Sequence, residues 1–217
     1  MHLSSQVPKH LQAGDTVKRL FDIAFASCGI VTCGPLMVVI AVAIKFTQGG
    51  PVIYRGKRTG RHGKPFPIFK FRSMVPNAEN IGGSTTGKND PRVTKLGGFL
   101  RRFKLDELPQ FVNVLKGDMS VVGPRPEVPE YTNRYSTDEV RILSLRPGIT
   151  DLASLEFSDL QSIVGVENAD ETFRQQVLPR KNQLRLKYVD EQSFFGDISI
   201  ILRTVTVVAS KPFRSSA

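Results

Sequence analysis

An apolar run of 25 residues, from Leu20 to Ile44, limits what this chain can fold into more than any other feature of its sequence. The run contains one charged residue, Asp22, close to its start. It is long enough to cross a bilayer as a helix, and it is too long and wrongly flanked for a cleaved signal peptide. A helix buried in a soluble core is the alternative. The run favours a membrane helix, which we place over residues 17–46.

A bend is expected near the middle of this run, at Gly34 and Pro35. Proline removes a backbone donor and clashes with the preceding turn, so a helix bends there. Lys and Arg near membrane helix ends favour the cytoplasmic side. Such residues flank both ends of the run, namely Lys18, Arg19, Lys45, Arg55, Lys57 and Arg58. The sequence thus favours a re-entrant helix that returns to the face it entered, with a kinked spanning helix as the competitor.

The net charge of +10 is concentrated in the middle of the chain. Residues 45–125 contain 16 Lys and Arg against 5 Asp and Glu, whereas residues 126–217 contain 11 against 13. A basic block of this kind suits nucleic acid, an anionic membrane surface or phosphorylated substrates. A basic but otherwise featureless soluble surface is the plain alternative.

Cysteine and histidine are scarce. Cys28 and Cys33 are the only cysteines and both lie in the apolar run, which argues against a disulfide scaffold. Three histidines and no CxxC motif leave a zinc site almost without ligands.

The remaining pattern predicts an α+β fold that is mostly helical. Short strands are expected at 52–54 and 67–71, a loop at 76–91, and helices within 96–115, 139–145 and 171–188. Residues 194–208 carry a broad apolar face that either docks on the core or lies in the membrane interface as an amphipathic helix. We expect a loose tail over 1–16, the membrane helix over 17–46, a catalytic domain over 47–209 and a second tail over 210–217.

One motif resembles a phosphate-binding P-loop but is rejected. Gly82–Lys88 (GGSTTGK) has the spacing, yet Asn89 stands where Mg²⁺ binding needs a Ser or Thr hydroxyl. Pro76 and Pro91 interrupt the strand and helix that should flank it. We expect a flexible loop.

An adjacent acid pair, Asp106 and Glu107, follows three cations, Arg101, Arg102 and Lys104. Nearby positive charge lowers carboxyl pKa values, so both acids can stay ionised. Such a pair can hold Mg²⁺ or place one carboxylate as a nucleophile toward phosphorus. The alternative is a solvated helix face with an Arg102–Asp106 ion pair worth about 0.2–0.5 kcal/mol.

Several cations stand at positions suited to phosphate. Arg125 lies between Pro124 and Pro126, which stiffen the backbone and favour a guanidinium that forks onto phosphate oxygens. Arg146 precedes a similar Pro-Gly turn, and Lys70 and Arg72 lie in an aromatic-rich strand. A structural turn with a surface arginine would look alike. Together with the acid pair and the apolar run, these cations indicate a phosphate-handling surface at a membrane.

These segments together resemble the monotopic phosphoglycosyltransferases, bacterial sugar transferases that begin glycan assembly on a polyprenyl carrier. The resemblance is carried by KRLFD (18–22), GPVIYRGKRTG (50–60), FKFRSM (69–74), DPRVTKLGGFLRR (90–102), LDELPQFVNVLKGDMSVVGPRPE (105–127) and RPGIT (146–150). It covers residues 17–150 and continues more weakly to about 209. The LDEL to GPRP run is the most specific part.

The resemblance implies a two-step mechanism. Asp106 would attack the sugar-bearing phosphate of a UDP-sugar and expel UMP, and polyprenyl phosphate would then take the phosphosugar. Glu107 would assist in metal and proton handling, with Mg²⁺ required and Mn²⁺ as a substitute. The resemblance places basic residues near the phosphates, which we assign to Lys70, Arg72, Arg101, Arg125 and Arg146. It also implies that Pro35 breaks a re-entrant membrane helix.

The chain departs from the family pattern in two places. Gly34 stands where many members have a serine, whose hydroxyl can bond a freed carbonyl. After RPGIT many members read GWAQVNG, whereas this chain reads DLASLEF over 151–157. The identity of the sugar therefore does not transfer from other members.

We expect the small form of the family, in the bacterial inner membrane and facing the cytoplasm. Its partners would be a UDP-sugar, polyprenyl phosphate and membrane lipids, with no nucleic acid; the oligomeric state is open, a homodimer included. A basic membrane adaptor is one rival, but it does not explain an acid pair among cations. A nucleic-acid-binding protein is another, but aromatic RNA-binding motifs are missing from the sequence.

Overall fold

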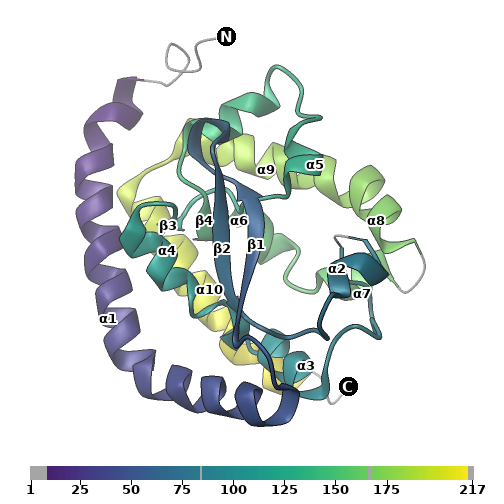
Figure 1. Ribbon diagram of the computed structural model, residues 1–217. Helices are drawn as coiled ribbons and strands as arrows, with labels where there is room; N and C mark the ends of the chain where they lie inside the picture. Colours follow the sequence, from purple (N-terminus) through teal and green to yellow (C-terminus); the bar gives the residue numbers. More distant parts are fainter. Residues whose placement is uncertain (1–8, 84, 166–167, 215–217) are drawn as a thin grey trace.

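A single bent helix, α1 (Lys9–Gln48), frames the rest of the protein. The computed structural model describes residues 9–83, 85–165 and 168–214. In Figure 1, α1 descends along the left side, turns a corner and continues along the bottom of the molecule. The segment expected as a loose tail over 1–16 is helical from Lys9, and residues 1–8 lie outside the described part.

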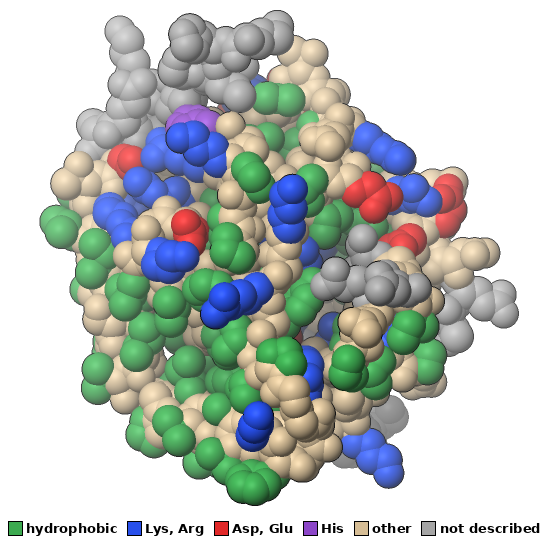
Figure 2. Space-filling model, viewed as in Figure 1, with side chains coloured by type: hydrophobic (Ala, Val, Ile, Leu, Met, Phe, Trp, Pro, Cys, Tyr) green, Lys and Arg blue, Asp and Glu red, His purple; other side chains and the backbone are tan. Residues whose placement is uncertain are grey.

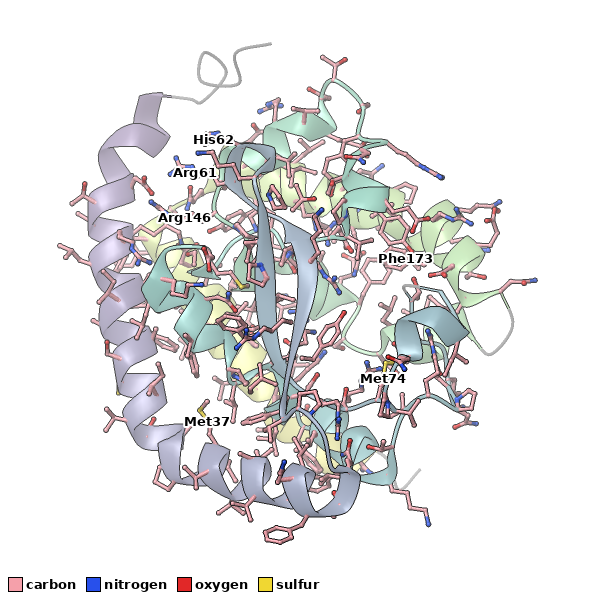
Figure 3. The ribbon with its side chains drawn as sticks, viewed as in Figure 1. Met37, Arg61, His62, Met74, Arg146 and Phe173 are labelled. Carbon is pink, nitrogen blue, oxygen red and sulfur yellow. The ribbon has the colours of Figure 1, made fainter. Side chains whose placement is uncertain are left out.

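The bend in α1 has a local cause. Pro35 lies inside the helix, and Met37 is labelled at the corner in Figure 3. The hydroxyl of Thr32 donates to the carbonyl of Cys28 at 2.8 Å, and such bonds to the preceding turn bend helices. Thr32 thus supplies a hydroxyl close to the position where Gly34 lacks one. The expected bend is present.

Most of the apolar surface of α1 is not covered by protein. The helix is long and apolar enough to cross a membrane, and only 11% of its most apolar stretch is buried. Val31 is 76% exposed and Phe46 is 85% exposed. Hydrophobic side chains gather along the left and lower margins in Figure 2, where α1 runs in Figure 1. The alternative of a helix buried in a soluble core is therefore wrong.

Two small sheets stand beside this helix. Strands β1 (Ile53–Thr59) and β2 (Pro65–Phe71) form an antiparallel hairpin joined by the 3₁₀ turn η2 (Arg61–Gly63). Strands β3 (Ser120–Val122) and β4 (Gly148–Thr150) pair in parallel, with Ser120 opposite Gly148. The two predicted strands are confirmed, and both are longer than expected: β1 continues to Thr59 and β2 begins at Pro65.

The helical segment expected over 96–115 is broken. It divides into α3 (Lys95–Arg102), the 3₁₀ turn η3 (Leu105–Glu107) and α4 (Gln110–Lys116). Lys104 adopts a left-handed conformation with φ 58°, which ends the regular helical path. Pro109 precedes α4, where a proline is tolerated at a helix start. Because of this break, the acid pair does not lie on the face of a continuous helix.

The rest of the chain is mostly helical, as expected. Its elements are α2 (Ala78–Ile81), α5 (Pro129–Thr132), η4 (Glu139–Ser144), α6 (Leu152–Glu156), α7 (Leu160–Val164), α8 (Ala169–Thr172), the π-helical turn η5 (Phe173–Val177), α9 (Leu178–Glu191) and α10 (Phe194–Arg214). Helix α10 extends into the expected tail, through residue 214. One face of α10 docks through Asp197 and Ile200, and the other exposes Phe195 and Leu202.

Close packing joins α1 to the rest of the protein. A Cβ on Gly29 would lie 2.8 Å from the ring of Phe111 on α4, so glycine permits this crossing. Farther along, Ile40 and Ile44 form a buried cluster with Phe71 and Leu100. Both halves of α1 therefore pack against the same domain.

Candidate active site

The broken helix places Asp106 and Glu107 in a buried turn. The pair lies in η3, with Asp106 4% exposed and Glu107 9% exposed. Their neighbours Leu105 and Leu108 pack against the cluster that contains Ile40 and Ile44 of α1. The acid pair is therefore fixed beside the C-terminal half of the apolar helix. The alternative of a solvated helix face is wrong.

Two cations hold Glu107 in its charged form. Lys70 on β2 donates to Glu107 Oε1 at 3.1 Å, and the guanidinium of Arg125 forms an ion pair with the same oxygen. Burial alone would raise the pKa of Glu107, but Arg125 and Lys70 hold that pKa well below its ordinary value. Burial in turn lowers the pKa of Lys70. Glu107 is thus the ionised partner of the pair.

Asp106 differs from its neighbour. Burial and the adjacent charge of Glu107 raise its pKa, against the opposing effect of Lys70, Lys104 and Arg101. Its Oδ1 atom is buried and has no hydrogen-bond partner. Buried polar atoms are rarely left unpartnered, and those that are often serve a function. Oδ1 is thus available to a metal ion or a substrate atom.

The side-chain amide of Gln110 is likewise buried without a hydrogen-bond partner. It lies one helical turn after Asp106, is fully buried, and has no hydrogen-bond partner for either amide atom. The sequence analysis missed Gln110, because burial of an amide without a partner has no signature in one sequence.

Arg125 is supported on three sides. Its backbone N–H donates to Asp151 Oδ2 at 2.9 Å, and its Nη1 donates to the carbonyl of Ile149 at 2.8 Å. The loop itself is placed by close backbone contact, because a Cβ on Gly148 would lie 2.1 Å from the backbone nitrogen of Gly123. The two Pro-Gly-rich turns that the sequence singled out therefore meet, and they direct Arg125 onto Glu107.

Arg101 lies on the other side of the acid pair. It donates from Nε to Ser73 Oγ at 2.8 Å, and its charge acts on both Asp106 and Glu107. A Cβ on Gly97 would lie 1.9 Å from the carbonyl oxygen of Ser73, so α3 can approach this segment only through glycine. Lys70, Arg101 and Arg125 are therefore brought together around the acids.

Arg72 and Arg146 do not lie beside the acid pair. Arg72 donates to the carbonyls of Gln48 and Gly49, so it caps the C-terminal end of α1. Arg146 donates to Asp15 Oδ1 at 2.6 Å, and Figure 3 shows it near Arg61 beside the N-terminal half of α1. Both cations are engaged in attaching α1, which sequence reasoning had no means to detect.

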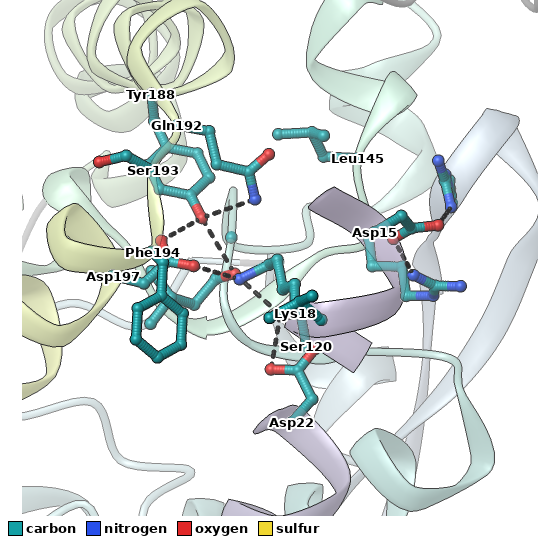
Figure 4. Close-up of a pocket in the computed structure, with 15 residues that line it drawn as sticks. Asp15, Lys18, Asp22, Ser120, Leu145, Tyr188, Gln192, Ser193, Phe194 and Asp197 are labelled. Carbon is teal, nitrogen blue, oxygen red and sulfur yellow. Dashed lines mark hydrogen bonds and ion pairs between the residues drawn. The ribbon is translucent and has the colours of Figure 1, made fainter. Parts of the chain in front are cut away.

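A second charged cluster, the α1 anchor, surrounds Arg146. In this cluster Lys18 pairs with Asp197 at 2.5 Å and Asp22 accepts from the hydroxyl of Ser120 at 3.0 Å. Its members line a cavity of about 180 Å³ between α1, β3 and α10, drawn in Figure 4. We define the α1 anchor as Asp15, Lys18, Asp22, Arg61, Ser120, Arg146, Tyr188 and Asp197.

Oxygen ligands for a metal are available at the acid pair. No group of three or more His, Cys, Asp and Glu side chains that could hold a metal occurs among the described residues. Mg²⁺ does not need one, since it is commonly held by one or two carboxylates together with water and substrate phosphates. Asp106 has a buried oxygen without a partner, and Glu107 is adjacent, so these two residues fit such an ion.

Comparison with known proteins identifies the family. The family model described as bacterial sugar transferase matches residues 13–211. A "Putative undecaprenyl-phosphate N-acetylgalactosaminyl 1-phosphate transferase" of Bacillus subtilis (strain 168) is 44% identical over 63% of this chain and 74% of its own length. The "Exopolysaccharide production protein ExoY" of Rhizobium meliloti (strain 1021) is 32% identical over 90% and 86%.

Other relatives are much longer than this chain. The "UDP-glucose:undecaprenyl-phosphate glucose-1-phosphate transferase" of Escherichia coli (strain K12) is 38% identical over 87% of this chain but only 39% of its own length. The chain thus spans about two fifths of several curated relatives that it matches. Because the family model covers nearly all of its residues, the chain belongs to the bacterial sugar transferase family.

Proposed function

We propose that this protein transfers a sugar 1-phosphate from a UDP-sugar to polyprenyl phosphate at the cytoplasmic face of the bacterial inner membrane. The observation that carries the proposal is the buried Asp106 carboxylate, which has an unpartnered oxygen among Lys70, Lys104 and Arg101. The family and the printed names of relatives agree with this chemistry. A basic adaptor would have no use for a buried acid pair.

In the first step, a carboxylate oxygen of Asp106 attacks the sugar-bearing phosphorus. The bond between that phosphorus and the bridging oxygen breaks, UMP leaves with the electron pair, and a phosphosugar–Asp106 intermediate remains. A raised pKa makes Asp106 a stronger nucleophile once it is ionised. Glu107 stays ionised beside Arg125 and Lys70, so its negative charge is present throughout.

In the second step, a phosphate oxygen of polyprenyl phosphate attacks the same phosphorus. The bond to Asp106 breaks, the carboxylate is regenerated, and a polyprenyl diphosphate sugar is released. The surrounding cations favour both steps, because they face the negative charge that gathers on the transferring phosphoryl group. Asp106 and Glu107 would hold Mg²⁺, which when bound neutralises phosphate charge.

The membrane part of the proposal concerns α1, which we infer to be re-entrant. Near its start, Arg19 donates to the carbonyl of Val114 at 2.6 Å, and Lys18 pairs with Asp197. At its end, Arg72 holds the carbonyl of Gln48 at 2.9 Å. A helix spanning a hydrocarbon core of about 30 Å would place these ends on opposite sides. Attachment of both ends to one domain supports a helix that dips in and returns.

The reaction is tested by UMP release. Purified protein is incubated with Mg²⁺, polyprenyl phosphate and a panel of UDP-sugars, and UMP and the lipid product are quantified. We expect one or a few sugars to give both products in equal amounts. Without acceptor, we expect UMP in no more than one equivalent and a protein mass increased by the phosphosugar. Steady UMP formation with no lipid product, or no UMP with any sugar, would contradict the proposal.

The topology is tested by cysteine labelling in intact cells. Cys28 and Cys33 are first replaced by serine, and single cysteines are then introduced as His10→Cys or Lys64→Cys. A membrane-impermeant maleimide should label neither site until the inner membrane is permeabilised. Labelling of residue 10 alone from outside would establish a spanning helix. Replacing Gly34 and Pro35 with leucine is the matched variant, and it should expose residue 10 in some molecules.

A further inference from the structure

Behind Arg125 lies a buried ionic chain that the proposed chemistry does not use. Its central residue is Arg185 on α9, whose side chain is completely buried. Arg185 donates from Nη2 to Glu127 Oε1 at 2.6 Å and from Nη1 to Asn182 Oδ1 at 3.0 Å. Its Nε faces Asp151 Oδ2 at 3.5 Å. A buried cation needs such partners, because an unpaired buried charge is costly.

Asp151 connects this chain to the active site. It is 1% exposed, and its Oδ1 accepts the backbone N–H of Ser154 at 2.6 Å, which caps α6. Its Oδ2 accepts the backbone N–H of Arg125 at 2.9 Å and faces Arg185. One carboxylate therefore joins three segments that are distant in sequence: the Arg125 loop, α6 and α9.

The position of the Arg125 backbone matters because both terminal nitrogens of its guanidinium already have partners. Nη1 bonds the carbonyl of Ile149 and Nη2 pairs with Glu107. A shift of the loop would remove the guanidinium from Glu107, since the side chain spans fixed partners. Pro124 and Pro126 restrict the loop, but they do not attach it to the core.

We propose that Asp151 and Arg185 are positioning residues for the transfer reaction, fixing the backbone of Arg125 so that its guanidinium stays on Glu107. This inference rests on the proposed function. Asp151 is the first residue of the segment DLASLEF, directly after β4, so it lies beside the Arg125 loop where that strand ends.

A merely structural role makes a different prediction. In that case Asp151, Arg185 and Glu127 would only hold α6 and α9 on the core, and their loss would reduce stability alone. The two roles differ in the kinetics of the folded variants. Only a positioning role lowers kcat/KM when the side chain that bonds Arg125 is changed, while the matched change at Glu127 leaves kcat/KM close to that of the wild type.

The experiment compares Asp151→Asn with Glu127→Gln in the UMP-release assay. Both variants remove one buried carboxylate charge that pairs with Arg185, but only Asp151 bonds Arg125. We expect Asp151→Asn to lower kcat/KM about 10- to 100-fold, as supporting residues typically do. Glu127→Gln should lose a similar amount of thermal stability while its kcat/KM stays close to that of the wild type.

Arg185→Lys is a second, milder variant that keeps the inference testable when Asp151→Asn does not fold. It keeps the positive charge but loses the contact from Nε to Asp151, so a smaller loss of kcat/KM is expected. A kcat/KM that stays at the wild-type value in both Asp151→Asn and Arg185→Lys, or that falls equally in Asp151→Asn and Glu127→Gln, would overturn the inference. If the wild-type protein releases no UMP from any UDP-sugar, the proposed function fails instead, and the two failures are therefore distinguishable.

Discussion

The candidate active site and the α1 anchor are both clusters of charged side chains, but they differ in how completely their carboxylates are bonded. In the anchor, Asp15 accepts Arg61 at 3.0 Å on one oxygen and Arg146 at 2.6 Å on the other. Asp197 likewise accepts Lys18 and the hydroxyl of Tyr188. In the active site, Asp106 Oδ1 has no partner at all.

This difference distinguishes carboxylates that hold the fold together from a carboxylate that can react or bind a ligand. A carboxylate whose two oxygens both have protein partners fixes two elements of the fold together. A buried carboxylate oxygen without a partner is unfavourable in the free protein, and it persists where a ligand or a reaction needs it. Net charge and burial alone would not have distinguished the two clusters. The predictions below test the distinction, from the largest expected effect to the smallest.

Asp106→Asn should abolish turnover, while Asp197→Asn should not. Loss of the nucleophile is expected to leave less than about a hundredth of the wild-type rate, a barrier increase of more than about 2.7 kcal/mol. Asp197→Asn removes the partner of Lys18 and should cost stability of about 3–5 kcal/mol. UMP release and thermal unfolding are measured on both variants. Substantial turnover by a folded Asp106→Asn protein would exclude Asp106 as the nucleophile.

Metal removal should affect the active site and not the anchor. Asp106 and Glu107 are oxygen ligands of the kind that Mg²⁺ prefers. We expect EDTA to eliminate UMP release, Mg²⁺ to restore it, Mn²⁺ to substitute at least in part, and the midpoint of thermal unfolding to stay unchanged. Full activity in rigorously metal-free buffer would contradict this prediction.

Arg125→Ala and Arg146→Ala should have unequal effects on the reaction. Arg125 pairs with Glu107, so its loss should lower kcat/KM by about 100-fold or more, as losses of charged groups at transferring centres do. Arg146 pairs with Asp15 on α1, so its loss should change kcat/KM less than about threefold and reduce stability by about 1 kcal/mol. Equal kinetic losses would mean that Arg146 leaves Asp15 to bind the substrate phosphate.

Much of this arrangement was predictable from sequence. The apolar run, its bend at Pro35 and the clustering of Lys70, Arg101 and Arg125 around the acids follow from local pattern and resemblance. The break in the helix between Arg102 and Gln110 did not, because a left-handed Lys104 is set by packing and not by its own preference.

The partners of the buried Arg185 side chain could not be predicted from the sequence either. Arg185 stands at helical spacing from Tyr188 and Val189, so it is a charged residue on a buried helix face. Which carboxylates neutralise it depends on contacts with residues 34 and 58 positions away. The positions of Arg72 and Arg146 could not be predicted for the same reason, since only the fold brings these two residues to α1.

The smallest expected effect concerns Lys181, a buried lysine near Glu127 and Arg185 that lies in neither cluster. Burial lowers its pKa from the ordinary 10.5 to about 8. Between these two pH values the folded protein therefore binds fewer protons than the unfolded chain, so stability should rise with pH. Tyr131 and Tyr135 act in the opposite direction above pH 10, because burial raises their pKa to about 12.

The measurement is thermal unfolding from pH 7 to pH 10, for the wild-type protein and Lys181→Met. In the wild type the contribution of Lys181 should raise the midpoint by a few degrees across this range, since about 1 kcal/mol corresponds to 2–4 °C in a chain of this size. Methionine has similar length and does not titrate, so that rise should be missing from the variant. If both proteins have the same slope, the pKa of Lys181 does not differ between the folded and the unfolded chain, and burial does not weaken the charge of Lys181 over this pH range.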